Sequence, residues 1–368
     1  GISYWELGDR KKGLEYKEKA LEIFKEVLGE KNADTASSYN NVGMSYWELG
    51  ERKKGLEYQE KALEIFKEVL GEKNANTASS YHNVGNSYWE LGDRKKGLEY
   101  KEKALEIFKE VLGEKNANTA SSYNSVGISY EELGDRKKGL EYQEKALEIR
   151  RKVLGEKNAD TAQSYNNVGI SYWELGDRKK GLEYQEKALE IRRKVLGEKN
   201  ADTAQSYNNV GISYEELGDR KKGLEYKEKA LEIRRKVLGE KNADTAQSYN
   251  NVGISYEELG DRKKGLEYKE KALKIRKEIL GEKNTATASL YHNVGYSYWK
   301  LGEAEKAIDY IERALDIYTA VLGNEHPTTQ KTLELLNLLE SFQDRQSSQC
   351  RKQTVFQRFF SKLKKLRK

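Results

Sequence analysis

Residues 127–168 read GISYEELGDRKKGLEYQEKALEIRRKVLGEKNADTAQSYNNV, and residues 169–210 repeat this stretch with one change, from Glu131 to Trp173. The same 42-residue unit recurs along the chain, and each copy begins at a glycine. A fixed period in this range is the sequence signature of a protein built by stacking one structural unit on the next. The eight copies begin at Gly1, Gly43, Gly85, Gly127, Gly169, Gly211, Gly253 and Gly295.

Each copy contains two stretches with the apolar periodicity of an α-helix. In one copy we expect helices over residues 34–49 and 51–70, with a glycine after each as a stop signal. Asp34 or Thr35 is the expected cap of the first helix. In three later copies the cap resembles a capping box, because an aspartate is followed three residues later by a glutamine. These pairs are Asp160 and Gln163, Asp202 and Gln205, and Asp244 and Gln247.

Two glycines lie inside the predicted helices. Gly43 lies beside the apolar stripe formed by Tyr39, Val42 and Tyr46, and Gly55 lies in the second helix. A glycine inside a helix costs about 1 kcal/mol relative to alanine. Because both glycines recur with the repeat, we expect them to bring the paired helices together nearly backbone to backbone.

The pattern Tyr39-x2-Val42-Gly43-x2-Tyr46 resembles the signature of tetratricopeptide repeats. The unit is 42 residues long, which exceeds the usual repeat of that family, and most copies lack its closing proline. Both departures resemble the longer repeats of kinesin light chain and of nephrocystin-like proteins, as does the sequence LGNEHP at residues 322–327. The resemblance implies an all-α fold, a right-handed superhelical solenoid of antiparallel helix pairs.

The chain is expected to contain a repeat array followed by a short C-terminal region. Residues 1–336 form eight repeats, the first of them truncated in its first helix. Residues 327–343 are predicted to be a capping helix that covers the open end of the array. Residues 344–353 are interpreted as a linker and residues 354–368 as a basic amphipathic helix. Because the chain begins inside a repeat, we expect it to be part of a longer protein.

Two neighbouring columns of first-helix residues are rich in asparagine, and in the tetratricopeptide family the first helices line the concave surface. An asparagine side chain both donates and accepts hydrogen bonds, so a ladder of them can pair with the backbone of an extended peptide. The alternative is that these side chains are solvated or bond to their own neighbours. The predicted peptide contacts are Asn40, Asn41, Asn83, Asn124, Asn166, Asn167, Asn208, Asn209, Asn250, Asn251 and Asn293.

A third column carries all five tryptophans, and glutamate replaces tryptophan in the remaining copies. Because these residue types do not exchange in a fully buried position, we expect the column to be at least partly exposed, as tryptophans at binding hot spots are. The alternative is packing between neighbouring first helices. A row of glutamates beside the column, beginning at Glu6, favours basic or aromatic peptides as ligands. The predicted contacts are Trp47, Trp89, Trp173 and Trp299.

The basic charge of the chain is concentrated at its C-terminal end. Residues 344–368 hold nine Lys/Arg and one Asp, whereas the rest of the chain holds 58 Lys/Arg and 60 Asp/Glu. Such an asymmetry indicates an interaction tail. The candidate partners are an acidic membrane surface, another protein, or the groove of the same chain or of a second copy, which would be self-association; a disordered basic end is the alternative. The residues predicted to interact are Phe356, Phe359, Phe360, Leu363, Lys362, Lys364 and Lys365.

The sequence contains no catalytic, metal-binding or cofactor motif. Its three histidines are widely separated, and no glycine-rich phosphate loop, nucleophile elbow or paired-cysteine motif occurs. We therefore expect no enzyme activity, no metal and no cofactor. The repeated Arg10-Lys11-Lys12 cluster is interpreted as a solvated edge, so no nucleic acid partner is expected. The single cysteine fits a reducing compartment, so we expect an intracellular, cytoplasmic location.

Two classes of function follow from these features. The first is a protein–protein interaction scaffold, an adaptor or ligand-sensing array that binds an extended peptide or a partner protein on its concave surface. The second is a rigid spacer whose tail directs it to a membrane surface or a partner.

Overall fold

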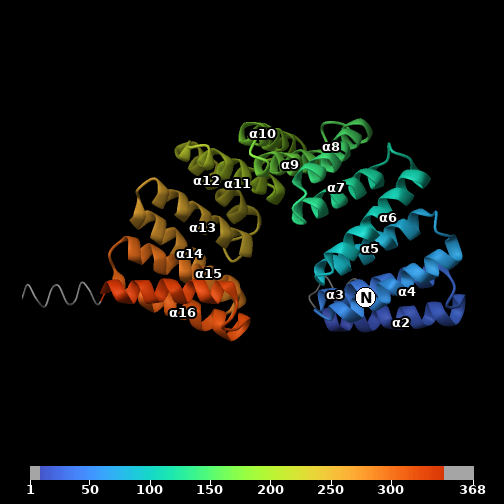
Figure 1. Ribbon diagram of the computed structural model, residues 1–368, viewed down its shortest axis with the longest axis horizontal. Helices are drawn as coiled ribbons and strands as arrows, with labels where there is room; N and C mark the ends of the chain where they lie inside the picture. The colour runs from blue at the N-terminus through green and yellow to red at the C-terminus, as the bar shows by residue number, and fades with distance from the viewer. Residues whose placement is uncertain (1–8, 344–368) are drawn as a thin grey trace, which may run out of the picture. The chain divides into compact units, whose positions relative to one another are not determined.

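The computed structural model describes residues 9–343, and every regular element within this range is an α-helix. First and second helices of the repeats alternate along the chain (Figure 1), which confirms the predicted all-α fold of stacked helix pairs. The first helices are α3 (Ala33–Glu48), α5 (Ala75–Glu90), α7 (Ala117–Glu132), α9 (Ala159–Glu174), α11 (Ala201–Glu216), α13 (Ala243–Glu258) and α15 (Thr285–Lys300). The second helices are α2 (Arg10–Leu28), α4 (Arg52–Leu70), α6 (Arg94–Leu112), α8 (Arg136–Val153), α10 (Arg178–Val195), α12 (Arg220–Val237), α14 (Arg262–Leu280) and α16 (Ala304–Leu322).

The chain divides into two compact units, residues 1–195 and residues 196–368. Helices α2 to α10 belong to the N-terminal unit, and helices α11 to α16 belong to the C-terminal unit. Within each unit a second helix packs against the first helix of its own repeat and against the first helix of the next repeat. Each unit is therefore a solenoid in which neighbouring repeats supply the packing surface.

The first helices are capped by asparagine, which corrects the sequence-based prediction. The Asn32 side chain accepts a hydrogen bond from the backbone N–H of Asp34 at 2.8 Å, so neither Asp34 nor Thr35 is the cap. Asn158 caps the corresponding helix in the same way. The expected capping box is absent there, because the Gln163 side chain donates to Asn167 instead, at 2.7 Å. Asparagine is as good a cap as aspartate, and the helix begins two residues earlier when it is used.

The paired helices touch at their glycines, as the sequence predicted. A Cβ atom added to Gly43 would lie 2.7 Å from the carbonyl oxygen of Gly55, and one added to Gly55 would lie 2.8 Å from that of Gly43. The same reciprocal contact recurs between Gly85 and Gly97. Any larger residue at these crossings would have to push the two helix backbones apart.

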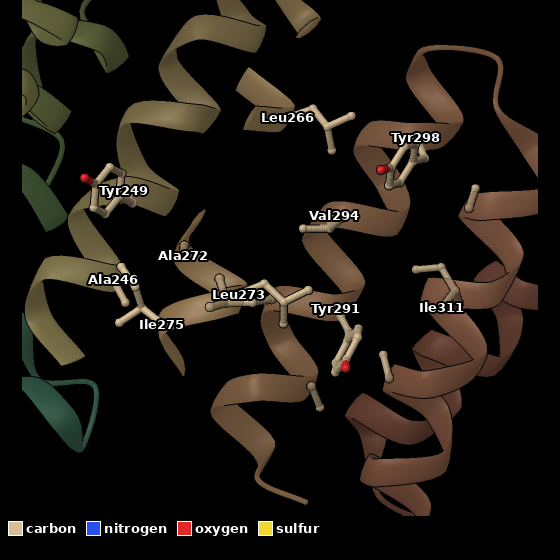
Figure 2. Close-up of a cluster of buried hydrophobic side chains, with 14 of the residues drawn as sticks. Ala246, Tyr249, Leu266, Ala272, Leu273, Ile275, Tyr291, Val294, Tyr298 and Ile311 are labelled. Carbon is tan, nitrogen blue, oxygen red and sulfur yellow. The ribbon is translucent and has the colours of Figure 1, made fainter. Parts of the chain in front are cut away.

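The hydrophobic core is a thin layer that continues from one repeat to the next. Figure 2 shows this layer in the C-terminal unit, where Tyr249 of α13, Leu273 of α14 and Val294 of α15 belong to one buried cluster. Ile311 of α16 and one valine in each first helix, from Val42 to Val294, are fully buried. Burying such a side chain contributes about 1.5–3 kcal/mol, and most of the burial comes from the partner helix or the next repeat.

Residues 327–343 are helical and pack onto the last repeat. Leu336 and Leu339 join the same buried cluster as Tyr318 of α16. The ring of Phe342 lies 5.5 Å from that of Trp299, measured between centroids. This placement supports a capping role for residues 327–343, which remains a proposal together with the domain boundaries.

The glycine crossing can be tested with Gly43→Ala. Helix propensity alone would make this change stabilising by about 1 kcal/mol. We expect it instead to lower the free energy of unfolding by about 2–3 kcal/mol, because the new methyl group meets the Gly55 carbonyl oxygen. The measurement is urea unfolding of the full chain, followed by circular dichroism.

The matched control is Ala307→Gly, since Ala307 is the one natural alanine at the position of Gly55 and is fully buried. It should cost about 1 kcal/mol through propensity. A Gly43→Ala variant as stable as the wild type would show that the helices need no glycine contact.

Candidate functional site

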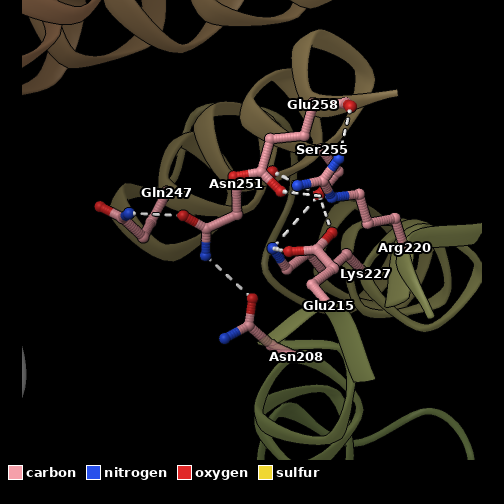
Figure 3. A network of polar contacts seen from close by, with 8 residues as sticks. All are labelled: Asn208, Glu215, Arg220, Lys227, Gln247, Asn251, Ser255 and Glu258. Atoms are coloured by element: carbon pink, nitrogen blue, oxygen red, sulfur yellow. Dashed lines mark hydrogen bonds and ion pairs between the residues drawn. The ribbon is translucent and has the colours of Figure 1, made fainter. Parts of the chain in front are cut away.

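The two asparagine columns lie on the first-helix face, the surface formed by α3, α5, α7 and α9 in one unit and by α11, α13 and α15 in the other. There they bond to one another across neighbouring repeats. The Asn83 side-chain amide donates to Asn40 Oδ1 at 3.2 Å, and Figure 3 shows the equivalent bond from Asn251 to Asn208 at 2.9 Å. Further bonds of this kind join Asn167 to Asn124 at 2.8 Å and Asn293 to Asn250 at 3.1 Å.

The asparagine side chains differ in how much of their surface is exposed to solvent. Asn166, Asn208 and Asn250 are buried, so these three side chains cannot present a broad surface to a ligand. Asn41 is exposed, and the remaining predicted contacts are half-buried: Asn40, Asn83, Asn124, Asn167, Asn209, Asn251 and Asn293. Some of these asparagines therefore join neighbouring repeats, and the others remain partly accessible to a ligand.

Trp47 and Trp89 of the third column pack partly against the next repeat. Trp47, Trp89, Trp173 and Trp299 are all half-buried. The indole N–H of Trp47 donates to Glu90 Oε2 at 3.1 Å, and that of Trp89 donates to Glu132 Oε2 at 2.9 Å. Packing between first helices and partial exposure thus occur together.

Where glutamate replaces tryptophan in this column, the carboxylate turns inward. Glu257 forms an ion pair with Lys269 at 2.8 Å, and both side chains are 4% exposed. Glu215 and Lys227 form the same pair (Figure 3). The expectation that tryptophan and glutamate exchange because the position is open is therefore wrong for these two copies. In these two copies the inward carboxylate meets a lysine of the second helix, Lys269 or Lys227.

That second-helix position carries lysine or glutamine and was not singled out from the sequence. Lys101 stands there in the repeat of Trp89, buried, with its ammonium nitrogen 4.7 Å from the indole centroid. The ammonium also donates to Ser129 Oγ at 3.0 Å. Burial lowers the pKa of Lys101 to about 8, although Glu132 and Glu90 act in the opposite direction. The signal for this position was available, since lysine or glutamine recurs there every 42 residues from Lys17 to Lys269.

Glu131 occupies the same column but faces a neutral residue. Gln143 donates to its Oε2 at 2.6 Å, and the hydroxyl of Ser171 contacts its other oxygen. Burial raises the pKa of Glu131 above its ordinary value of 4.5, and the nearby Glu174 acts in the same direction.

A hollow of about 190 Å³ opens between α3, α4 and α5, and we call it the Trp47 hollow. Its wall combines an indole ring with the carboxylates of Glu48 and Glu90, so it is negatively charged. Two predicted contacts, Trp47 and Asn83, meet there. The lining residues are Met44, Trp47, Glu48, Gln59, Asn83, Asn86, Ser87 and Glu90.

A second hollow, of about 220 Å³, lies between α5, α6 and α7, and we call it the Ser122 hollow. Its walls are neutral at physiological pH, because burial lowers the pKa of His82 to about 4. The buried Ser122 hydroxyl has no hydrogen-bond partner among the described residues. The lining residues are Ser79, His82, Asn83, Phe108, Asn118, Ser121 and Ser122.

The next repeat shows what a filled version of the Ser122 hollow looks like. Arg150 replaces Phe108 there and is buried. Its guanidinium donates to Ser164 Oγ at 2.8 Å, to the carbonyl oxygen of Asp160 at 3.1 Å and to Ser121 Oγ at 3.1 Å. These acceptors correspond to Ser122, Asn118 and Ser79 one repeat earlier, all of which line the hollow. Among the described residues, the phenylalanine therefore leaves the Ser122 hydroxyl without the hydrogen bond that Ser164 receives from Arg150.

Two other kinds of site, metal sites and membrane spans, are absent from the described part of the chain. Residues 9–343 contain no group of three or more His, Cys, Asp or Glu side chains that could hold a metal ion. No helix within the same range is long and apolar enough to cross a membrane. The predicted tail contacts, from Phe356 to Lys365, lie outside the described residues.

Comparison with known families agrees with this architecture. The tetratricopeptide repeat family matches residues 1–68, 34–110, 77–152, 127–194, 160–236 and 202–278, and a further tetratricopeptide repeat description matches residues 287–328. No curated protein matches the chain.

Three solved structures are similar in fold. A putative kinesin light chain of Podospora anserina with nearly identical TPR-like repeats is 18% identical, with a TM-score of 0.50 over 56% of this chain and 97% of that one. BtubC (BKLC) from P. vanneervenii is 23% identical, with a TM-score of 0.53 over 63% and 91%. The apo form of RapI is 21% identical, with a TM-score of 0.55 over 77% and 97%. These matches confirm the resemblance to kinesin light chain-like repeats at the level of the fold.

The buried carboxylate of Glu131 can be tested with Gln143→Lys. Lys269 pairs with Glu257 at the equivalent positions, so the new ammonium should pair with Glu131 and raise the free energy of unfolding by about 1–3 kcal/mol at pH 7. The raised pKa penalises the folded wild type above that pKa, and the penalty disappears below the ordinary value of 4.5. The gain should therefore shrink as pH falls from 7 to 4, measured by urea unfolding.

Gln185→Lys is the control, because Gln185 stands at the same position in the repeat that carries Trp173. It should show no such loss between pH 7 and pH 4. An equal gain at both pH values for Gln143→Lys would mean that Glu131 is not a buried, charged partner.

Proposed function

Because this chain belongs to the tetratricopeptide repeat family, whose repeats mediate protein–protein interaction, we propose that it is a scaffold that binds an extended peptide segment of a partner protein along its first-helix face. The observation that carries the proposal is the pair of adjoining hollows in the N-terminal unit. The Trp47 hollow and the Ser122 hollow both have Asn83 in their wall. A ligand that fills both must pass across the Asn83 side chain, as an extended segment does.

The chemistry of the two hollows differs, which gives the bound segment a direction. The Trp47 hollow offers carboxylates and an indole ring, so it favours a basic or aromatic side chain. The Ser122 hollow offers a buried hydroxyl and neutral walls, so it favours an uncharged donor such as a peptide N–H or a carboxamide. Between them, the half-buried Asn83 amide can bond to the peptide backbone.

The proposal can be tested by selecting peptides from a displayed random library against the full chain. We expect enrichment of segments that carry a basic residue, and we expect Asn83→Ser to weaken the best binders about tenfold. Serine is the chain's own residue at the equivalent position, Ser125, so the fold should tolerate it. Affinities are measured by isothermal titration calorimetry.

Asn167→Ser is the matched control, because it removes the same kind of bond between repeats, to Asn124, outside both hollows. It should leave binding unchanged. A library that yields no binder would favour the rigid spacer instead. Equal losses for both variants would show that the asparagines act through repeat packing and do not contact the peptide.

A further inference from the structure

We propose that the Trp47 hollow is a subsite for the primary ammonium group of a lysine side chain, which the indole face of Trp47 and the carboxylates of Glu48 and Glu90 bind together. This inference rests on the proposed function, since the lysine belongs to the bound segment. It adds the chemical class that the site selects. Three observations support it: an internal copy of the occupied site, the fixed position of the indole ring, and the charge of the wall.

The chain contains an occupied copy of this site one repeat later. Moving 42 residues along the sequence converts Trp47 into Trp89 and Gln59 into Lys101. In that copy the Lys101 ammonium lies 4.7 Å from the indole centroid of Trp89 and bonds to Ser129. In the Trp47 copy the shorter Gln59 accepts from Ser87 instead, and a hollow remains in front of the ring. The ligand that this wall accommodates is therefore visible in the neighbouring repeat.

The indole ring of Trp47 is held in place before any ligand arrives. Its N–H donates to Glu90 at 3.1 Å, and the guanidinium carbon of Arg52 lies 5.7 Å from the ring centroid. Trp89 has the same two neighbours, Glu132 at 2.9 Å and Arg94 at 5.7 Å, and it still receives Lys101. Because the two surroundings match, the guanidinium of Arg52 does not prevent a second cation from approaching Trp47.

The carboxylates determine which organic cation fits. Glu48 and Glu90 line the hollow on two neighbouring first helices, and both are exposed enough to remain hydrated until a ligand binds. A primary ammonium has three donors, so it can meet a carboxylate and the polar wall while its alkyl stem covers the indole ring. The Met44 side chain, on the same wall, offers an apolar surface to that stem.

The test uses n-butylammonium, a lysine side chain without its backbone, and the full chain labelled with 5-fluorotryptophan. The ¹⁹F signal of Trp47 is assigned from its loss in Trp47→Glu. Titration with n-butylammonium should shift this signal at least tenfold more at equal concentration than n-butanol, which has the same stem and no charge. The Trp89 signal should stay in place, because Lys101 already occupies that site.

Two reciprocal substitutions make the result specific. Gln59→Lys should fill the Trp47 hollow from within and reduce the Trp47 response at least tenfold. Lys101→Gln should empty the neighbouring site and make the Trp89 signal respond to n-butylammonium. Both variants carry a residue that the chain already uses at that position, so neither should unfold the repeat. An unchanged Trp47 response in Gln59→Lys, or an equal response to n-butanol, would overturn the proposal.

The same experiment separates this inference from the function on which it rests. A response to n-butylammonium without any peptide binder keeps the subsite and rejects the extended-peptide proposal. Peptide binders that lose no affinity when lysine becomes norleucine, together with no n-butylammonium response, reject the subsite alone.

The lysine could belong to a partner or to the basic tail of this chain, which contains Lys362, Lys364 and Lys365. Changing these three residues to glutamine in the full chain distinguishes the two sources. A several-fold higher affinity for n-butylammonium in this variant assigns the bound lysine to the tail. An unchanged affinity assigns it to a partner.

Discussion

The close approach of two helix backbones at a pair of glycines determines the geometry of every repeat. Because Gly43 and Gly55 leave no room for a Cβ atom, the two helices cross at one point and in one register. Side chains at a fixed distance in sequence from that crossing therefore meet the same partners in every copy. This is why residues 28 apart, such as Lys101 and Ser129, bond in one repeat after another. The polar contacts between repeats follow from an apolar, steric constraint.

The polar side chains between repeats fill the same buried position in several different ways. Second helices such as α6 and α14 place a long side chain between the tryptophan or glutamate of their own repeat and a serine of the next. Lysine pairs with glutamate in Lys269–Glu257 and stacks over tryptophan in Lys101–Trp89. A buried cation needs such a partner, because losing its hydration costs several kcal/mol. Glutamine avoids that cost and leaves more space, which is the origin of the Trp47 hollow.

The sequence predicted the features that depend on a single column of residues. The 42-residue period predicted the helix pairs, the apolar stripe that contains the fully buried Val42, and the glycine crossing. The sequence did not predict features that depend on two columns at once. The inward carboxylate of Glu257 pairs with Lys269, twelve residues away on another helix, and this partner is not apparent when the glutamate column is considered by itself. The prediction of the helix caps was wrong for a related reason. Asn32 and Asp34 can both cap the same helix end, and sequence spacing does not decide between two good caps.

Because the repeats are nearly identical, each position where one copy differs from the others is informative. The other copies show which side chain the same backbone position holds when the hollow is filled. The Trp47 hollow exists where glutamine replaces the lysine of the next copy, and the Ser122 hollow exists where Phe108 replaces Arg150. In the next repeat Lys101 and Arg150 occupy the equivalent positions and bond to serine side chains. Both hollows lie in the N-terminal unit, and both have Asn83 in their wall. A uniform array would present the same surface in every repeat. In this chain Gln59 and Phe108, both on second helices, break that uniformity.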